Sequence, residues 1–207
     1  MKTLAIALLI PVAICTACSG REKSPSSQSA APAEATVNAP AANAAPVQAP
    51  APATPAAQTT ASAKLVSAAG ATASGNLELT SEGVAVRVRG EITGLAPGKE
   101  HGFHVHEKGE CSPPDFASAG EHLNPTQDPH GGPKSASKHL GDLPNLKADA
   151  NGHVTVDVSI TGATLVDKDG GPNQILGKAL VVHAMPDDYK TQPAGDSGGR
   201  IACGVIR

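Results

Sequence analysis

The stretch that decides the fold reads Val154-Thr155-Val156-Asp157-Val158-Ser159-Ile160. Apolar and polar side chains alternate along it with a period of two, as in an antiparallel strand with one face in a core and one in water. Residues 84–89 repeat this alternation. Further candidate strands are residues 77–80, 102–106, 179–184 and 201–206. Gly, Pro, Asn and Asp clusters separate these segments, and no window carries a long apolar stripe at helical spacing. The sequence therefore predicts an all-β domain, an antiparallel sandwich or barrel.

The composition argues against nucleic acid as a partner. The chain has 207 residues with only three aromatic side chains, Phe103, Phe116 and Tyr189, so it lacks the stacking platforms that single strands need. Lys and Arg number 16 against 19 Asp and Glu, which gives a net charge of -3. The basic patch expected of a duplex-binding protein is therefore missing.

Residues 1–17 are typical of an export signal, with one cation at Lys2, an apolar run and small residues before Cys18. The run is too short for a lasting membrane span. Cys15-Thr16-Ala17-Cys18 looks like the lipobox of bacterial lipoproteins, although its first position usually carries Leu, Val or Ile. The interpretation is that Cys18 is acylated and holds the protein on a membrane. The alternative is ordinary signal cleavage beside an unmodified Cys18.

Residues 18–63 are interpreted as a tether. From residue 24 onward they consist largely of Ala, Pro, Ser and Thr, with Glu34 as the only charge. Such a segment has too little apolar surface to offset the entropy of ordering. Residues 64–207 are then expected to form one folded domain.

Histidines provide the chemical signal. All eight lie in the expected domain, and His104 and His106 are two apart on a candidate strand, where they share a face. The long stretch 107–153 contains His122, His130 and His139 with Asp142 close behind, and His183 ends another apolar run. Imidazole ligands suit copper and zinc, and metal coordination explains how so polar a loop becomes ordered.

Six motifs resemble the copper/zinc superoxide dismutases, in order from about residue 65 to 206. They are Gly102-Phe103-His104-Val105-His106-Glu107, Gly120-Glu121-His122-Leu123-Asn124-Pro125, His130-Gly131-Gly132-Pro133, His139-Leu140-Gly141-Asp142-Leu143, Val181-Val182-His183 and Gly199-Arg200-Ile201-Ala202-Cys203-Gly204-Val205-Ile206. The resemblance implies a Greek-key antiparallel β-sandwich or barrel of about eight strands, with long metal-binding and electrostatic loops.

The resemblance also implies the ligands of one copper and one zinc per subunit. Copper would be bound by His104, His106, His122 and His183. Zinc would be bound by His122, His130, His139 and Asp142. His122 then bridges both ions as an imidazolate and, on reduction, accepts a proton that it passes to the product. His101 and His153 match no ligand position and are interpreted as packing or surface histidines.

Asp187 falls where the family has a carboxylate that hydrogen-bonds one histidine of each metal. The other interpretation is an exposed turn aspartate beside Asp188. Arg200 falls where the family attracts and orients the anionic substrate. Without the resemblance it would equally be an exposed arginine at a strand end. Lys134, Lys138 and Lys190 are loop cations that add to the steering field, and the sequence does not say which of them matters.

Two thiols remain in the expected domain once Cys15 leaves with the signal and Cys18 takes a lipid. An exported domain normally pairs such thiols, and family members make the link that corresponds to Cys111–Cys203. This disulfide would help to aim Arg200. The alternative is that Cys111 or Cys203 is a reactive thiol or a soft metal ligand.

The resulting hypothesis is a bacterial envelope enzyme that converts superoxide to dioxygen and hydrogen peroxide through alternate reduction and oxidation of copper, with Arg200 and His122 as catalytic residues. Two other classes remain open, a copper and zinc store and a catalytically silent surface module. The sequence leaves open whether the domain is a monomer or a homodimer.

Overall fold

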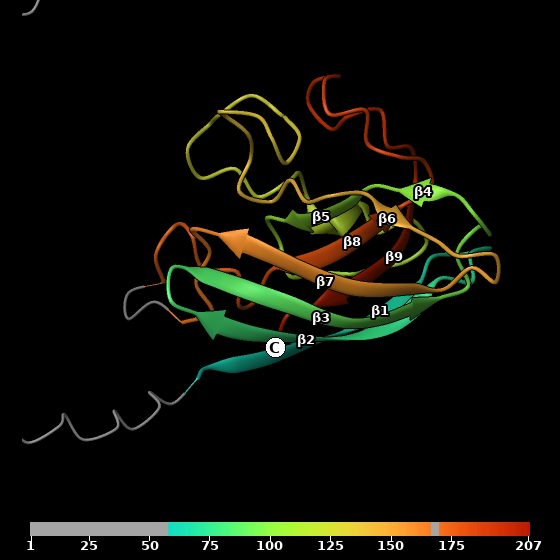
Figure 1. Ribbon diagram of the computed structural model, residues 1–207, viewed down its shortest axis with the longest axis horizontal. Coiled ribbons are helices and arrows are strands. Elements are labelled where there is room, and N and C mark those ends of the chain that lie inside the picture. The colour runs from blue at the N-terminus through green and yellow to red at the C-terminus, as the bar shows by residue number, and fades with distance from the viewer. Residues whose placement is uncertain (1–57, 167–169) are drawn as a thin grey trace, which may run out of the picture. The chain divides into compact units, whose positions relative to one another are not determined.

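The structure, a computed structural model, describes residues 58–166 and 170–207 (Figure 1). The predicted signal, Cys18 and the tether up to residue 57 lie outside the described residues. The strands are β1 (Thr60–Ser67), β2 (Ser74–Glu82), β3 (Ala85–Thr93), β4 (Glu100–His101), β5 (Phe103–His106), β6 (Leu146–Lys147), β7 (Val154–Thr161), β8 (Ala179–His183) and β9 (Arg200–Val205). A single 3-10 turn, η1 (Ala117–Ala119), accompanies them, and no helix in the described part of the chain is long and apolar enough to cross a membrane.

Seven strands form one curled antiparallel sheet in the order β5-β8-β9-β1-β2-β3-β7, and β4 pairs with β6 in a second, small sheet. β3 and β7 lie side by side although three strands separate them along the chain (Figure 1). Such a crossover connection is typical of Greek-key sheets. The all-β fold class predicted from the alternating segments is confirmed.

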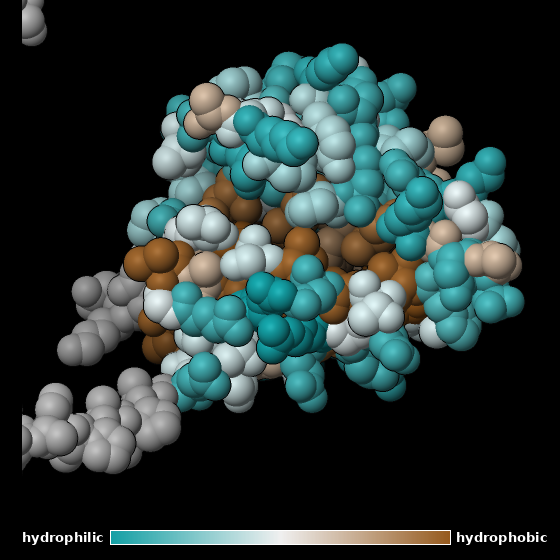
Figure 2. All heavy atoms as spheres, viewed as in Figure 1, coloured by the Kyte–Doolittle hydropathy of each residue, from teal (hydrophilic) through white to brown (hydrophobic). Residues whose placement is uncertain are grey.

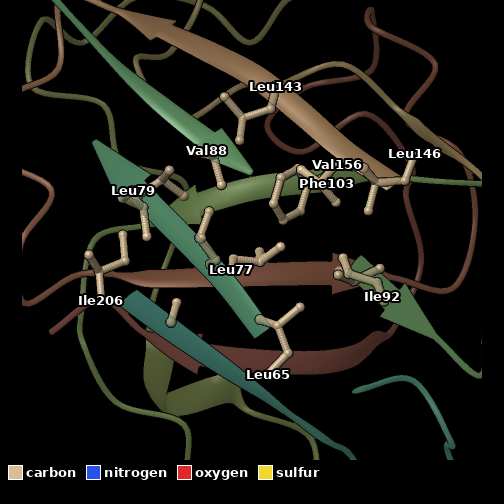
Figure 3. Close-up of a cluster of buried hydrophobic side chains, with 14 of the residues drawn as sticks. Leu65, Leu77, Leu79, Val88, Ile92, Phe103, Leu143, Leu146, Val156 and Ile206 are labelled. Carbon is tan, nitrogen blue, oxygen red and sulfur yellow. The ribbon is translucent and has the colours of Figure 1, made fainter. Parts of the chain in front are cut away.

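The alternating residues fill the core as predicted. Val154, Val156 and Ile160 of β7 are buried, and Val86 and Val88 of β3 face the same interior. Figure 3 shows their neighbours from the other strands pointing toward one another, while Figure 2 shows hydrophilic residues over much of the outer face. Each fully buried Leu, Ile or Val contributes about 1.5–3 kcal/mol through lost contact with water.

The start of the folded domain differs from the expected boundary at Lys64. β1 begins at Thr60, inside the range assigned to the tether, and Ala63 pairs with Leu77 of β2. Ala63 and Leu65 are both 1 % exposed. Residues 60–67 do alternate with period two, but their core face is built partly from alanine, which is also the commonest residue of the low-complexity segment before them. The boundary therefore moves toward the N-terminus.

Val84 also differs from its prediction as a strand residue. It is 80 % exposed in the β2–β3 turn, next to Gly83 with its positive φ of 61°, and β3 begins one residue later. Val84 is needed to reverse the chain in this turn, so the strand predicted for residues 84–89 begins one residue too early.

Candidate metal centre

The long segment between β5 and β7 returns to β5 and adds backbone hydrogen bonds to its edge. Val105 N–H donates to Gly141 O (2.9 Å), and Leu123 N–H donates to Val105 O (2.8 Å). A Cβ at Gly141 would lie 2.2 Å from Val105 O, so only glycine permits this approach. The contacts bring His122 opposite His106 and Asp142 opposite His104. Local backbone pairing thus places two loop side chains beside two strand histidines.

The partner strand β8 supplies the fourth histidine of the first cluster. The register of β8 against β9 shifts between Val182 and His183, and irregularities of this kind redirect a side chain at the end of a strand. His183 Nδ1 then lies 3.1 Å from Gly198 O, and its Nε2 lies 3.4 Å from His106 Nε2. We call the resulting set the four-histidine cluster; its members, all buried, are His104, His106, His122 and His183.

The second set gathers around one carboxylate oxygen. Asp142 Oδ1 lies 2.9 Å from His122 Nδ1, 3.0 Å from His130 Nδ1 and 3.2 Å from His139 Nδ1. Its other oxygen, Oδ2, accepts the backbone N–H groups of Gly131 (3.1 Å) and His139 (2.9 Å). We call this set the Asp142 cluster: His122, His130, His139 and Asp142. His122 belongs to both clusters.

The unpaired ring nitrogens indicate what the clusters can hold. Among the described residues of the two clusters, the buried ring atoms His104 Nδ1 and His122 Nε2 have no hydrogen-bond partner, and His130 Nδ1 and His139 Nδ1 face only the shared Asp142 Oδ1. An unsatisfied polar atom in a protein interior is unfavourable, and buried lone pairs gathered at close range need a cation. In each cluster the candidate ligand atoms all lie within 4.8 Å of one another. Nitrogen ligands with a single carboxylate fit copper and zinc.

Asp187 joins the two clusters from outside. It is 3 % exposed, and its carboxylate accepts His104 Nε2–H through Oδ2 (2.9 Å) and His130 Nε2–H through Oδ1 (2.9 Å). Each bond leaves the Nδ1 of its histidine free to face a metal. Asp187 therefore lies where the resemblance implied, in contact with one histidine of each cluster, and it is not an exposed turn residue.

Sequence reasoning missed the residues that hold these elements in place. Asn145 brackets the backbone of Asp187, accepting Asp187 N–H and donating to Asp187 O (both 2.9 Å). Gln192 does the same for His130, accepting its N–H (2.8 Å) and donating to its O (2.9 Å). Neither residue belongs to a motif, and a single sequence carries no signal for an amide that binds a backbone 40 or more positions away.

Arg200 at the start of β9 is fixed by two carbonyls. Its Nη1 donates to Phe116 O (2.7 Å) and its Nη2 donates to Gly120 O (2.6 Å). Gly120 O also accepts His106 Nδ1–H (2.9 Å), so this one carbonyl joins Arg200 to the four-histidine cluster. No ion pair within the described residues involves Arg200. Its charge is therefore available to an anion.

The disulfide Cys111–Cys203 is present, with a Cα–Cα distance of 5.7 Å. It joins the segment that carries Phe116 and Gly120 to the strand that carries Arg200. The alternatives of a reactive thiol or a soft metal ligand are thereby excluded for both cysteines.

The remaining predicted residues take lesser roles. His101 is buried and its Nδ1 donates to His183 O (2.8 Å), whereas His153 is exposed. Lys138 Nζ donates to the carbonyls of His139 (3.2 Å) and Asp142 (2.8 Å), and Lys134 and Lys190 are exposed. Lys138 thus stabilises the turn of the Asp142 cluster and does not point its charge at free solvent.

Burial controls the ionisation of the strand histidines. It lowers the pKa of His104 to about 4, of His106 to about 2 and of His183 to about 3, because the imidazolium loses its water. Burial also lowers the pKa of His130, but hydrogen bonds to Asp142 and Asp187 outweigh it and raise the pKa to about 9. Burial opposes ionisation of Asp142, yet hydrogen bonds from His122, His130 and His139 hold its pKa well below the usual range.

These pKa values predict how the stability of the metal-free protein depends on pH. Below pH 6.5, His104, His106 and His183 gain protons in the unfolded chain but not in the folded one. Each therefore lowers the free energy of unfolding by about 1.4 kcal/mol per pH unit, down to its folded pKa. The stabilisation that His130 provides to the folded protein is complete below pH 6.5 and is lost as the pH rises through about 9. The free energy of unfolding of the metal-free protein, measured with urea, should therefore be largest near pH 6.5. A free energy of unfolding that increases as the pH falls from 6.5 to 4.5 would contradict the expectation.

Comparison with known proteins agrees with this geometry. A family model described as copper/zinc superoxide dismutase (SODC) matches residues 73–206. Superoxide dismutase [Cu-Zn] 2 of Aquifex aeolicus is 46% identical over 136 residues, covering 64% of this chain and 78% of that protein. Superoxide dismutase [Cu-Zn] 1 of the same organism is 44% identical over 136 residues, covering 64% and 79%. The crystal structure of a SOD-like protein from Bacillus subtilis matches with a TM-score of 0.61 at 39% identity, covering 69% of this chain and 95% of that one.

Proposed function

The chain belongs to the copper/zinc superoxide dismutase family, and from this premise we propose how its own residues carry out the reaction. The protein is an oxidoreductase whose substrate is superoxide and whose cofactors are copper and zinc. The observation that carries the proposal is that two buried ligand clusters share His122 and lie beside an arginine that has no acidic partner among the described residues.

We assign copper to the four-histidine cluster and zinc to the Asp142 cluster. The Asp142 cluster offers three imidazoles and one carboxylate, a closed set that suits a structural zinc ion. The four-histidine cluster offers nitrogen alone, a set that suits copper. When bound, copper would supply the one-electron chemistry that oxidises one superoxide to dioxygen and reduces a second, together with two protons, to hydrogen peroxide.

Arg200 binds and orients the substrate in this proposal. Superoxide is a small monoanion, and a guanidinium remains charged at any working pH. The two carbonyls that accept Arg200 Nη1 and Nη2 fix the group in place. A fixed cation beside a ligand cluster raises the local concentration of anions and increases their rate of encounter.

His122 moves a proton in this proposal. Its Nδ1 faces Asp142 Oδ1, and its Nε2 is buried with no partner. With Nδ1 engaged in the Asp142 cluster, Nε2 is the ring atom that would take up a proton and donate it to the reduced product. The ring keeps its position because its other nitrogen, Nδ1, is held within the Asp142 cluster.

The test of the proposed function is Arg200→Ile in metal-loaded protein. We expect the rate of superoxide dismutation to fall about tenfold or more, because a charge that attracts the substrate is lost. Copper and zinc contents should remain unchanged, since Arg200 contacts carbonyls and no ligand atom. Arg89→Ile on the outer face of β3 is the matched control and should keep full activity. If metal-loaded wild-type protein showed no turnover of superoxide, the proposed enzymatic activity would be refuted. A metal store would then be the better interpretation.

We further propose that the enzyme is a lipoprotein of a bacterial envelope, held by an acylated Cys18 and separated from the membrane by the tether. The signal-like residues 1–17, the lipobox-like Cys15 to Cys18 and the low-complexity composition that follows support this proposal. The enzyme would then intercept superoxide outside the cytoplasm and protect the envelope.

Cys18→Ala tests the anchor. A single substitution that blocks acylation should move the protein from the membrane fraction into the soluble fraction, because the buried acyl chains supply the membrane affinity. Immunoblots of fractionated cells give the distribution, with Cys15→Ala as the matched control that stays on the membrane. Membrane retention of the Cys18 variant would contradict acylation at this residue.

A further inference from the structure

Phe116 has a backbone conformation that an aromatic residue rarely adopts. Its φ is 59° and its ψ is 24°, in the left-handed region that normally requires glycine or asparagine. Such a residue is maintained only where the surrounding structure fixes it, and residues of this kind concentrate at functional sites.

The side chain of Phe116 provides that fixation. The ring is 1 % exposed and belongs to a small apolar cluster separate from the main core. The buried members of this cluster are Ala68, Phe116, Ala119, Ala179, Val181 and Cys203. They come from β8, β9, η1 and the chain after β1, so the ring joins the loop before η1 to the sheet.

The left-handed turn directs the carbonyl of Phe116. Phe116 O accepts Ala119 N–H (3.0 Å) and also Arg200 Nη1 (2.7 Å). Phe116 N–H donates to Ser112 O (3.1 Å), so the backbone of Phe116 is hydrogen-bonded at both its N–H and its carbonyl. Neither cysteine of the disulfide makes a hydrogen bond to Arg200; the direct contacts are Phe116 O and Gly120 O.

We propose that Phe116 is a positioning residue for the substrate-binding arginine: its buried ring anchors the loop, and its left-handed backbone presents the carbonyl that fixes Arg200. The sequence-based expectation gave this task to the disulfide. Phe116 performs it through a main-chain oxygen, so an apolar residue that is not branched at Cβ and fills the same space can substitute for it. The inference rests on the proposed role of Arg200 in anion binding.

Azide, a small monoanion, is the probe, titrated against the visible absorption of copper in the metal-loaded full chain. Phe116→Ala should weaken azide binding about tenfold at unchanged copper and zinc content, since a hydrogen bond to a charged group is no longer held in place. Phe116→Leu keeps the apolar cluster filled and should stay within about twofold of wild type. Val181→Ala removes apolar volume from the same cluster without touching Arg200, and it should lower the unfolding temperature but not the azide affinity.

A double-mutant cycle separates this inference from the proposed function. In an Arg200→Ile background, Phe116→Ala should change azide affinity by less than about twofold, because the two residues act through one contact. If Arg200→Ile alone leaves azide binding unchanged, the role of Arg200 fails. If Arg200→Ile weakens binding but Phe116→Ala does not, or if Val181→Ala weakens it as much, only the role of Phe116 fails.

If Phe116→Ala does not fold, a measurement on the unmutated protein still tests the proposal. In the reduced, diamagnetic enzyme, the Arg200 side-chain N–H should have an NMR order parameter near 0.85, about that of rigid backbone. A value below about 0.6 would show a mobile guanidinium and would overturn the proposal.

Discussion

Replacing Asp187 with asparagine is expected to weaken zinc binding by about 10- to 100-fold. The carboxylate accepts His104 Nε2–H and His130 Nε2–H at once, at 2.9 Å each. An asparagine side chain has one oxygen, so it can serve only one of these donors, and its NH2 group would face the other. The histidine left without an acceptor then loses the tautomer that presents Nδ1 to the metal.

Competition with a chelator on the loaded protein measures the effect, as the concentration at which half of the zinc is lost. Asp188→Asn is the matched control, because Asp188 is an exposed neighbour whose carboxylate accepts only from Thr191 and Lys190. It should retain zinc as wild type does. Equal zinc retention in the two variants would show that Asp187 is dispensable for the metal centre.

Loss of the disulfide is expected to lower the free energy of unfolding by about 4–5 kcal/mol. The bond closes a loop across 92 positions, and in the chain-entropy model so long a loop restricts the unfolded chain strongly. Cys111→Ala with Cys203→Ala removes the bond while keeping the buried site of Cys203 apolar. Urea unfolding of metal-loaded protein measures the difference.

Reduction of the wild-type protein with a thiol reagent is the control, and it should give the same loss within about 1 kcal/mol. A double variant as stable as oxidised wild type would contradict the entropic account. Azide binding, by contrast, should respond more to Phe116→Ala than to loss of the disulfide, because Phe116 itself supplies a carbonyl that contacts Arg200, whereas Cys111 and Cys203 make no hydrogen bond to its guanidinium.

Most strands were predictable because half-buried strands reveal themselves through period two. Residues 154–160 became β7 and residues 77–80 lie within β2. β1 was missed since Ala61 and Ala63 carry too little hydrophobicity to distinguish a strand from a low-complexity segment. β4 and β6 contain two residues each, too few for any periodic signal.

The clusters were predictable for a different reason. His104 and His106 share a strand, and the loop histidines stand among turn residues, so the resemblance to a known family could assign them position by position. The structure then brought all seven of these side chains together in two sets. Their supports, Asn145, Gln192 and Phe116, could not be assigned, because nothing in their local sequence identifies a partner.

The sequence by itself determined most of the strands, the residue types that can hold copper and zinc, and the pair of cysteines. These follow from periodicity and from side-chain chemistry, which are properties of short segments. Only the tertiary structure decided that Asp142 Oδ1 meets three imidazoles, that Asp187 serves both clusters and that Phe116 O holds Arg200. Those contacts depend on the packing of distant segments against one sheet, and packing is set by the whole chain at once.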